Sequence, residues 1–126
     1  NDLDIKMSIY KRVSLIINNQ QRNHLMVELL DRFGELPFEV ENLFKLIEIR
    51  ILCIKTNINR VEFGQKGILF SFYKNKPLNP KKLLKLVFSN KKHIKIRSDQ
   101  KVFFDFNRKM KEDTFVLVKK IINLIS

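Results

Sequence analysis

The sequence has few of the residues from which most catalytic and metal sites are built. Its 126 residues include one cysteine, two histidines and three glycines. Cys53 lies among apolar residues and has no CxxC partner, so an internal disulfide is excluded and a buried, inert thiol is favoured. This cysteine usage fits a cytoplasmic protein. His24 and His93 are isolated from each other in sequence, as surface histidines commonly are.

Three glycines also exclude the loops that hold nucleotide phosphates. Neither the GxGxxG nor the GxxxxGK[ST] spacing occurs, and the four ligands of a structural zinc site are not available. The sequence therefore predicts no catalytic residue, no cofactor-binding residue and no metal ligand. By itself, the chain is not expected to be an enzyme.

Long apolar runs are missing as well. No run approaches the ~20 residues that a membrane span needs, and no segment has the layout of a signal peptide. The hydrophobic fraction of 44% and the charged fraction of 30% are those of a soluble globular protein. The length predicts one domain covering residues 1–126, with no membrane partner.

The net charge of +12 allows two interpretations. A field of this sign favours binding of a polyanion such as DNA or RNA, which makes a basic nucleic-acid-binding module one candidate function. The other interpretation is codon usage biased towards A and T, because Lys, Ile and Asn are all frequent. We favour the second interpretation, because the lysines are dispersed along the sequence and arginine is a minority among the basic residues.

Apolar residues at helical spacing predict three helices in the first half of the chain. The first covers residues 3–18, the second ends at Gly34, and the central one runs from Pro37 to Asn57. In the first helix, an apolar stripe of Leu3, Met7, Tyr10, Ser14 and Ile17 has Ile9, Val13 and Ile16 beside it. The expected inner side of the second helix consists of Leu25, Met26, Leu29, Leu30 and Phe33. The central helix has a main stripe of Val40, Leu43, Phe44, Ile47, Ile51, Ile54 and Ile58, and a second edge of Leu46, Ile49 and Cys53.

After Asn57 the apolar period changes to that of strands. Val61 and Phe63 alternate with polar neighbours, a turn from Gly64 to Gly67 follows, and residues 68–73 return as the second strand of a hairpin. A short helix over residues 80–88, a second hairpin over residues 94–106 and a final helix from about Lys111 to Ser126 complete the chain. The predicted fold is α+β: three N-terminal helices, then hairpin, helix, hairpin and helix, with the helices packed on an antiparallel sheet of about four strands.

The aromatic residues of these strands favour a core rather than a base-stacking surface. Sheets that bind RNA expose two or three aromatic rings on their open face. Here the core faces carry Phe70, Phe72, Phe104 and Phe106, whereas the outward aromatic candidates are Tyr73 and Phe103. We expect the phenylalanines to fill the core.

The segment Glu28–Phe44 reads ELLDRFGELPFEVENLF. It resembles the signature ELxDRFGxLPxEVxNL of the C-terminal domain of bacterial transcription-repair coupling factor. The matching motif residues are Asp31, Arg32, Phe33, Gly34, Leu36 and Pro37. The resemblance extends to the entry segment Asp2–Arg12 and to the strand and Lys66-Gly67 turn after the central helix. It covers roughly the first seventy residues, and the lysine-rich second half follows the family only in the order of its elements.

The resemblance implies a role within a larger protein. The whole factor would be a bacterial, cytoplasmic DNA translocase that uses ATP to release stalled RNA polymerase and recruits UvrA for nucleotide excision repair. Its motor and polymerase-binding domains would lie upstream of this chain. The C-terminal domain would be a non-catalytic clamp on the N-terminal UvrA-binding domain of the same protein, covering that surface until the motor engages.

Two acidic residues of the second helix are the candidate contact site. If Leu25, Leu29, Leu30 and Phe33 turn inward, Glu28 and Asp31 lie on the outer side, three residues apart and therefore neighbours on one face. The resemblance implies that they form salt bridges with arginines of the UvrA-binding domain. The alternative is a local ion pair between Glu28 and Arg32, worth ~0.3–0.5 kcal/mol.

Overall fold

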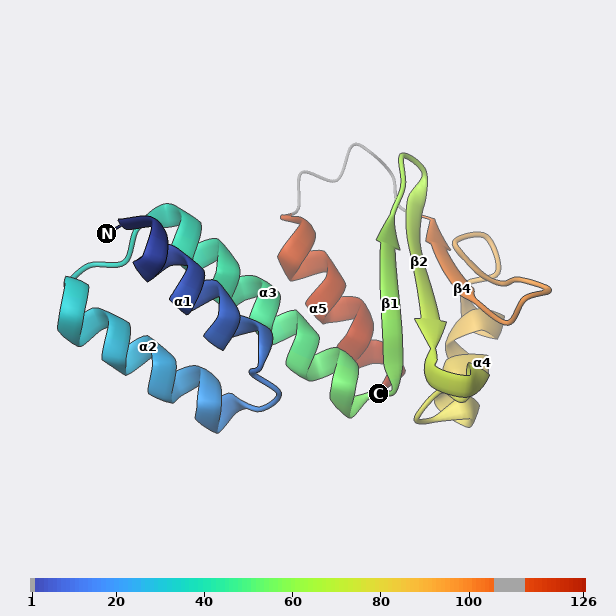
Figure 1. The fold of residues 1–126 in the computed structure, drawn as a ribbon. Helices are drawn as coiled ribbons and strands as arrows, with labels where there is room; N and C mark the ends of the chain where they lie inside the picture. Colours follow the sequence, from blue (N-terminus) through green and yellow to red (C-terminus); the bar gives the residue numbers. More distant parts are fainter. Residues whose placement is uncertain (1, 106–112) are drawn as a thin grey trace. The chain divides into compact units, whose positions relative to one another are not determined.

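The computed structural model describes residues 2–105 and 113–126 (Figure 1). The chain divides into two compact units, Asn1–Ile51, which we call the helical unit, and Leu52–Ser126, which we call the sheet unit. The elements are α1 (Asp2–Ser14), α2 (Asn19–Phe33), α3 (Phe38–Lys55), β1 (Ile58–Phe63), β2 (Gly67–Phe72), the 3₁₀ turn η1 (Tyr73–Asn75), α4 (Pro80–Ser89), β3 (Ile94–Ile96), β4 (Val102–Asp105) and α5 (Thr114–Ile125). The predicted α+β fold and its order of elements are confirmed. Within the described residues, no helix is both long and apolar enough to span a membrane.

The helical unit has one apolar core to which α1, α2 and α3 contribute (Figure 1). Its buried residues are Val13, Ile16, Leu25, Leu29, Phe44, Ile47 and Ile51, and the partly buried residues packed against them are Ile9, Met26, Leu36 and Val40. The predicted stripe of α3 therefore supplies the core with three residues. Glu39 and Glu41 lie in the first turn of α3, where negative charge is favoured by the helix dipole.

Two features of the predicted helix faces are corrected by the structure. In α1 the buried side is the one with Val13, whereas Leu3 and Met7 of the neighbouring stripe are exposed. In α2, Leu30 and Phe33 are exposed to 44% and 47%, so the expectation that they turn inward is wrong. Both helices carry more apolar surface than a three-helix core can cover, and spacing alone does not reveal which stripe is covered.

Three arginines connect the three helices in pairs. Arg12 of α1 forms an ion pair with Glu28 of α2. Arg22 of α2 pairs with Glu48 of α3, with 2.5 Å between Nη2 and Oε1. Arg50 of α3 donates from Nη1 to the carbonyl oxygen at position 13, at the end of α1, over 2.9 Å. Each pair of helices in the unit is therefore joined by a polar contact as well as by the core.

The sheet unit contains a four-stranded antiparallel sheet in the order β1-β2-β4-β3. Phe70 and Phe104 meet edge to face, with ring centroids 5.3 Å apart. The buried apolar residues of this unit are Ile58, Ile68, Phe70, Phe72, Leu83, Ile94, Val102, Phe104, Val118, Ile121, Ile122 and Ile125. The prediction that Phe70, Phe72 and Phe104 fill the core is confirmed, while Phe106 and Lys111 lie outside the described residues.

Gly67 begins β2 at a point where no side chain fits. A Cβ at this position would lie 2.1 Å from the carbonyl oxygen of Phe104 and 2.7 Å from a ring carbon of Phe103. The pairing of Gly67 with Asp105 brings β4 this close. The glycine is therefore required by the approach of the two strands, and the half-buried Phe103 covers it.

Strand β1 contains an irregularity that the predicted alternation did not include. Its pairing with β2 shifts in register between Ile58 and Arg60, where β1 has one extra residue. Directly paired residues share a face of the sheet, so Phe63, which pairs with the buried Ile68, lies on the core face as expected. It is nevertheless 56% exposed, because it is the last residue of an edge strand, and its expected burial is wrong.

Candidate interdomain contact site

The motif turn between α2 and α3 is built by three residues with separate tasks. Gly34 ends α2 with φ 73° and ψ −133°, and its N–H donates to the carbonyl oxygen of Leu30 over 2.8 Å. L-residues rarely adopt this conformation, which glycine adopts readily. Leu36 packs against the helical core. The carbonyl oxygen of Pro37 accepts from the N–H groups of Val40 and Glu41, which starts α3.

The remaining motif residues are exposed. Asp31, Arg32 and Phe33 are all on the surface of α2. The guanidinium carbon of Arg32 lies 5.1 Å from the centroid of the Phe33 ring, a cation–π distance. The structure thus separates the motif into residues that shape the turn and residues that face outward beside it.

Glu28 has a partner that the sequence analysis did not identify. Its Oε2 pairs with Nη1 of Arg12, and the two side chains are 38% and 40% exposed. The local pair between Glu28 and Arg32 is therefore not formed, because Arg32 lies over Phe33 instead. Among residues 2–105 and 113–126, Asp31 has no ion-pair partner.

The sequence carries no simple signal for Arg12. Two helices joined by a short loop lie antiparallel, so residues at roughly equal distances from the loop are expected to meet. Arg12 precedes the connection at residues 15–18 by three residues, whereas Glu28 follows it by ten, so this rule does not select the pair. The i,i+4 rule that suggested Arg32 considers only one helix.

An apolar hollow of about 350 Å³ lies beside the motif, within the helical unit. Its lining residues are Asp2, Ile5, Lys6, Ile9, Leu29, Phe33, Glu35, Leu36, Pro37 and Val40. The volume is at the lower end of the ~300–1,000 Å³ of small-molecule sites. The half-exposed ring of Phe33 forms part of its wall, whereas Glu28 and Asp31 lie on the other flank of α2, away from the lining.

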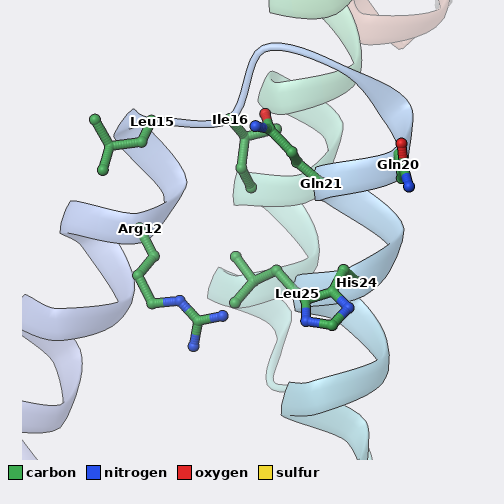
Figure 2. Close-up of a pocket in the computed structure, with 7 residues that line it drawn as sticks. All are labelled: Arg12, Leu15, Ile16, Gln20, Gln21, His24 and Leu25. Atoms are coloured by element: carbon green, nitrogen blue, oxygen red, sulfur yellow. The ribbon is translucent and has the colours of Figure 1, made fainter.

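A second hollow, of about 440 Å³, lies towards the other end of α1 and α2 (Figure 2). Figure 2 shows the guanidinium of Arg12 extending from α1 towards α2, where His24 and Leu25 line the opposite side. Gln21 accepts from the N–H of Ile17 over 2.8 Å, which fixes the loop at its rim. Arg12 therefore lines this hollow and also holds Glu28.

The chemistry available here is that of recognition. Within the described parts of the chain, no group of three or more His, Cys, Asp or Glu side chains is placed to hold a metal ion. The helical unit presents carboxylates, a guanidinium, an exposed ring and two hollows, which are groups of the kind found at protein interfaces.

Comparison with known proteins decides the family. The family model of the TRCF domain matches residues 1–83. The chain belongs to the TRCF domain family. The resemblance inferred from the sequence is thereby confirmed, and the match includes the whole motif turn.

Relatives and a solved structure agree with this assignment. The chain is 34% identical over 103 residues to the transcription-repair-coupling factor of Rickettsia conorii, covering 82% of this chain and 9% of that protein. It is 31% identical over 124 residues to that of Haemophilus influenzae, covering 98% and 11%. The crystal structure of the C-terminal domain of transcription-repair coupling factor superposes with a TM-score of 0.71 at 22% identity, over 97% of this chain and 77% of that one. At this identity the structure supports the fold alone, and the chain spans about a tenth of the length of these two curated relatives.

Proposed function

We propose that this TRCF domain is a non-catalytic clamp within a transcription-repair coupling factor. It packs on the N-terminal UvrA-binding domain of the same protein and keeps that surface covered until the motor engages. The whole protein is then a cytoplasmic, ATP-dependent DNA translocase that acts on stalled RNA polymerase and recruits UvrA. The family assignment supports the parent protein, and the acidic face of α2 supports the contact.

The observation that supports the clamp is the exposure and pairing of the Glu28 and Asp31 carboxylates. Asp31 is exposed without an ion-pair partner among the described residues, and Glu28 is half-exposed beside it. Arginine forks of a partner would form charge-assisted hydrogen bonds with both, and these are stronger than neutral ones. Phe33 and the hollow that it lines supply apolar area at the C-terminal end of the same helix. The combination is that of an interface with charged specificity and an apolar anchor.

The test is the affinity of this chain for the N-terminal domain of its own protein, measured by calorimetry. Glu28→Ala with Asp31→Ala should weaken binding by about 2 kcal/mol or more, the scale of truncating one side of a hydrogen-bonded charge pair. Arg12→Ala should instead strengthen binding, because it releases Glu28. Asp4→Ala with Glu39→Ala is the matched control, since it removes the same charge from exposed positions of α1 and α3. Equal affinity of the Glu28/Asp31 variant and the wild type would exclude these residues from the contact.

Folding must be intact for that comparison to count. The far-UV circular dichroism spectrum of each variant should match that of the wild type. The free energy of unfolding in urea should agree within about 1 kcal/mol, because the altered side chains are at least partly exposed. A melted α2 in the Glu28/Asp31 variant would mean that the pair is structural. The purified chain should also show no nucleotide hydrolysis with or without DNA, as expected of a chain lacking a phosphate-binding loop.

A second function is favoured by one observation, the uneven distribution of charge. The helical unit has seven Lys and Arg against eight Asp and Glu, whereas the sheet unit has eighteen against five. We propose that the sheet unit also acts as a basic nucleic-acid-binding module. This function concerns other residues than the clamp, so the two are compatible.

A further inference from the structure

The excess of lysine in the sheet unit is not a by-product of codon usage. Bias towards A and T raises Lys, Asn and Ile together. Asn occurs five times in the helical unit and seven times in the sheet unit, and Ile seven and eight times, whereas Lys occurs three and fifteen times. Asn and Ile are thus spread over both units, while Lys is concentrated in one. The lysines of the sheet unit need an explanation specific to that unit.

The lysines are concentrated further within one continuous stretch of structure. Residues 74–101 carry ten Lys and Arg and one acidic residue, Asp99. Asp99 is occupied by Arg97, with Nη2 and Oδ2 2.9 Å apart. The stretch comprises α4, the following turn and β3, and α4 contacts β3 in the fold. The exposed lysines from α4 to β3 are Lys81, Lys82, Lys85, Lys91, Lys92 and Lys95, which we call the lysine surface.

Stability accounts for only part of the lysine surface. Lys95 lies on β3, an edge strand, and lysine on an edge discourages pairing with other chains. Lys82 also has a structural contact, because its Nζ donates to the carbonyl oxygen of Ser126 over 3.4 Å. Lys81 and Lys82 both lie in the first turn of α4, which has no acidic residue. Positive charge there opposes the helix dipole and costs about 0.3–1 kcal/mol per residue. These positions are more favourable when an anion is bound.

The exposed aromatic residues do not provide a base-stacking platform. Lys91 Nζ lies 5.5 Å from the ring centroid of Phe88, and Lys74 Nζ lies at the same distance from that of Tyr73. Each ring therefore already has an ammonium over one face. Among the phenylalanines of the strands, Phe70, Phe72 and Phe104 are in the core, and Phe103 is half-buried. Proteins that hold single strands rely on rows of free aromatic faces, whereas the exposed ring among these lysines, Phe88, already has Lys91 over one face.

We propose that the lysine surface binds the phosphate backbone of duplex DNA without reading its bases. This inference rests on the second proposed function and assigns to it a surface and a ligand. Duplex DNA has one charge per ~1.7 Å of its axis, against ~3.4 Å for each strand, so a surface that contacts only the backbone meets more phosphates on the duplex than on one strand. Lysine ammonium groups act as point charges on flexible stems and suit such contacts, whereas base recognition relies on the arginine fork.

The experiment measures binding of the chain to a fluorescein-labelled duplex by anisotropy, from 50 to 200 mM salt. The probes are two duplexes of unrelated sequence and one of their single strands. The wild type should bind both duplexes equally and more tightly than the single strand. The logarithm of the binding constant should fall with the logarithm of salt by about 0.9 for each phosphate neutralised.

The deciding variant is Lys81→Gln with Lys85→Gln and Lys92→Gln. It should lower affinity at 50 mM salt by about tenfold or more and reduce the salt slope by about 2 to 3. Lys11→Gln with Lys55→Gln and Lys66→Gln removes the same charge elsewhere and should leave the slope within about 1 of the wild type. Circular dichroism checks that both variants keep the fold.

Each outcome has a separate meaning. Salt-dependent binding that the two triple variants lower equally would overturn the lysine surface and leave the nucleic-acid-binding module standing. Absence of salt-dependent binding by the wild type would overturn both. Tighter binding of the single strand would overturn the duplex as the ligand. The clamp would be unaffected by any of these results.

Discussion

The helical unit and the sheet unit of this chain are each stabilised internally by a different kind of contact. In the helical unit, three of the four arginines connect different helices over 16 to 37 residues of sequence. In the sheet unit, the two described arginine pairs, Arg60 with Glu62 and Arg97 with Asp99, are local. The sheet unit depends instead on strand pairing and on a core of phenylalanine and aliphatic residues.

This difference shows which charged side chains are used in internal contacts and which remain on the surface. Arginine in the helical unit is used in internal contacts, because its planar fork forms several directed hydrogen bonds. Most of the described lysines of the sheet unit are exposed, and acidic residues are few there. The proposed clamp therefore uses carboxylates of the helical unit, whereas the proposed contact with DNA uses the positive charge of the sheet unit. The predictions below probe this contrast.

The largest effect on stability should come from adding a side chain at Gly67. In Gly67→Ala the new Cβ would meet the carbonyl oxygen of Phe104 at 2.1 Å, so β2 and β4 must separate. We expect the free energy of unfolding to fall by about 3 kcal/mol or more, at the upper end of overpacking costs. Urea unfolding followed by circular dichroism measures it.

Gly64→Ala is the control for this substitution. A Cβ at Gly64 would have its nearest neighbour, the carbonyl oxygen of Gly67, at 3.6 Å, an ordinary contact distance. Its effect should stay below about 1 kcal/mol. Similar losses in the two variants would show that strand approach is not what requires glycine at position 67.

A smaller effect should distinguish the arginines of the two units. Arg22→Ala removes a pair with Glu48 in which the side chains are only 19% and 30% exposed, and should lower the free energy of unfolding by about 1–2 kcal/mol. Arg60→Ala removes a pair with Glu62 in which the arginine is 68% exposed, and should cost below about 0.5 kcal/mol. Equal costs would contradict the view that arginine has a structural role mainly in the helical unit.

Much of the fold could be predicted because its signals are local. The change from helical to strand spacing after Asn57, the glycine-bounded turn before β2 and the capping residues all act within a few residues. Asn57 itself adopts a positive φ of 63° between α3 and β1, and its N–H₂ group donates to the carbonyl oxygen of Tyr73 over 3.2 Å. The family motif was readable for the same reason, since Gly34, Leu36 and Pro37 build one turn.

The sequence could not supply what depends on the meeting of distant segments. The choice of apolar stripe in α1, the exposure of Leu30 and the pair between Arg12 and Glu28 all follow from how helices pack. The bulge in β1 depends on its pairing with β2, and the division after Ile51 falls inside a helix without any break in its pattern. For the candidate site, the sequence could name Glu28 and Asp31, but it could not supply the ion pair between Glu28 and Arg12.

The smallest effect concerns Cys53, which lies in α3 just beyond the boundary between the units. Burial raises the pKa of its thiol from 9.0 to about 11. The unfolded chain therefore loses this proton before the folded chain does. The stabilising contribution is complete below pH 9 and is lost as the pH rises from about 9 to about 11. Relative to Cys53→Ala, the wild type should lose stability over this range of pH, because the variant has no thiol to ionise.

Thiol chemistry gives an independent measure of the same burial. At pH 8 a pKa of about 11 instead of 9.0 lowers the thiolate fraction by about a hundredfold. The more basic thiolate is intrinsically more nucleophilic, with a Brønsted coefficient of about 0.4–0.5, which recovers nearly tenfold. Alkylation by iodoacetamide in native buffer should therefore be about tenfold slower than in urea at the same pH. A native rate equal to that in urea would mean that the Cys53 thiol is open to solvent in the folded chain.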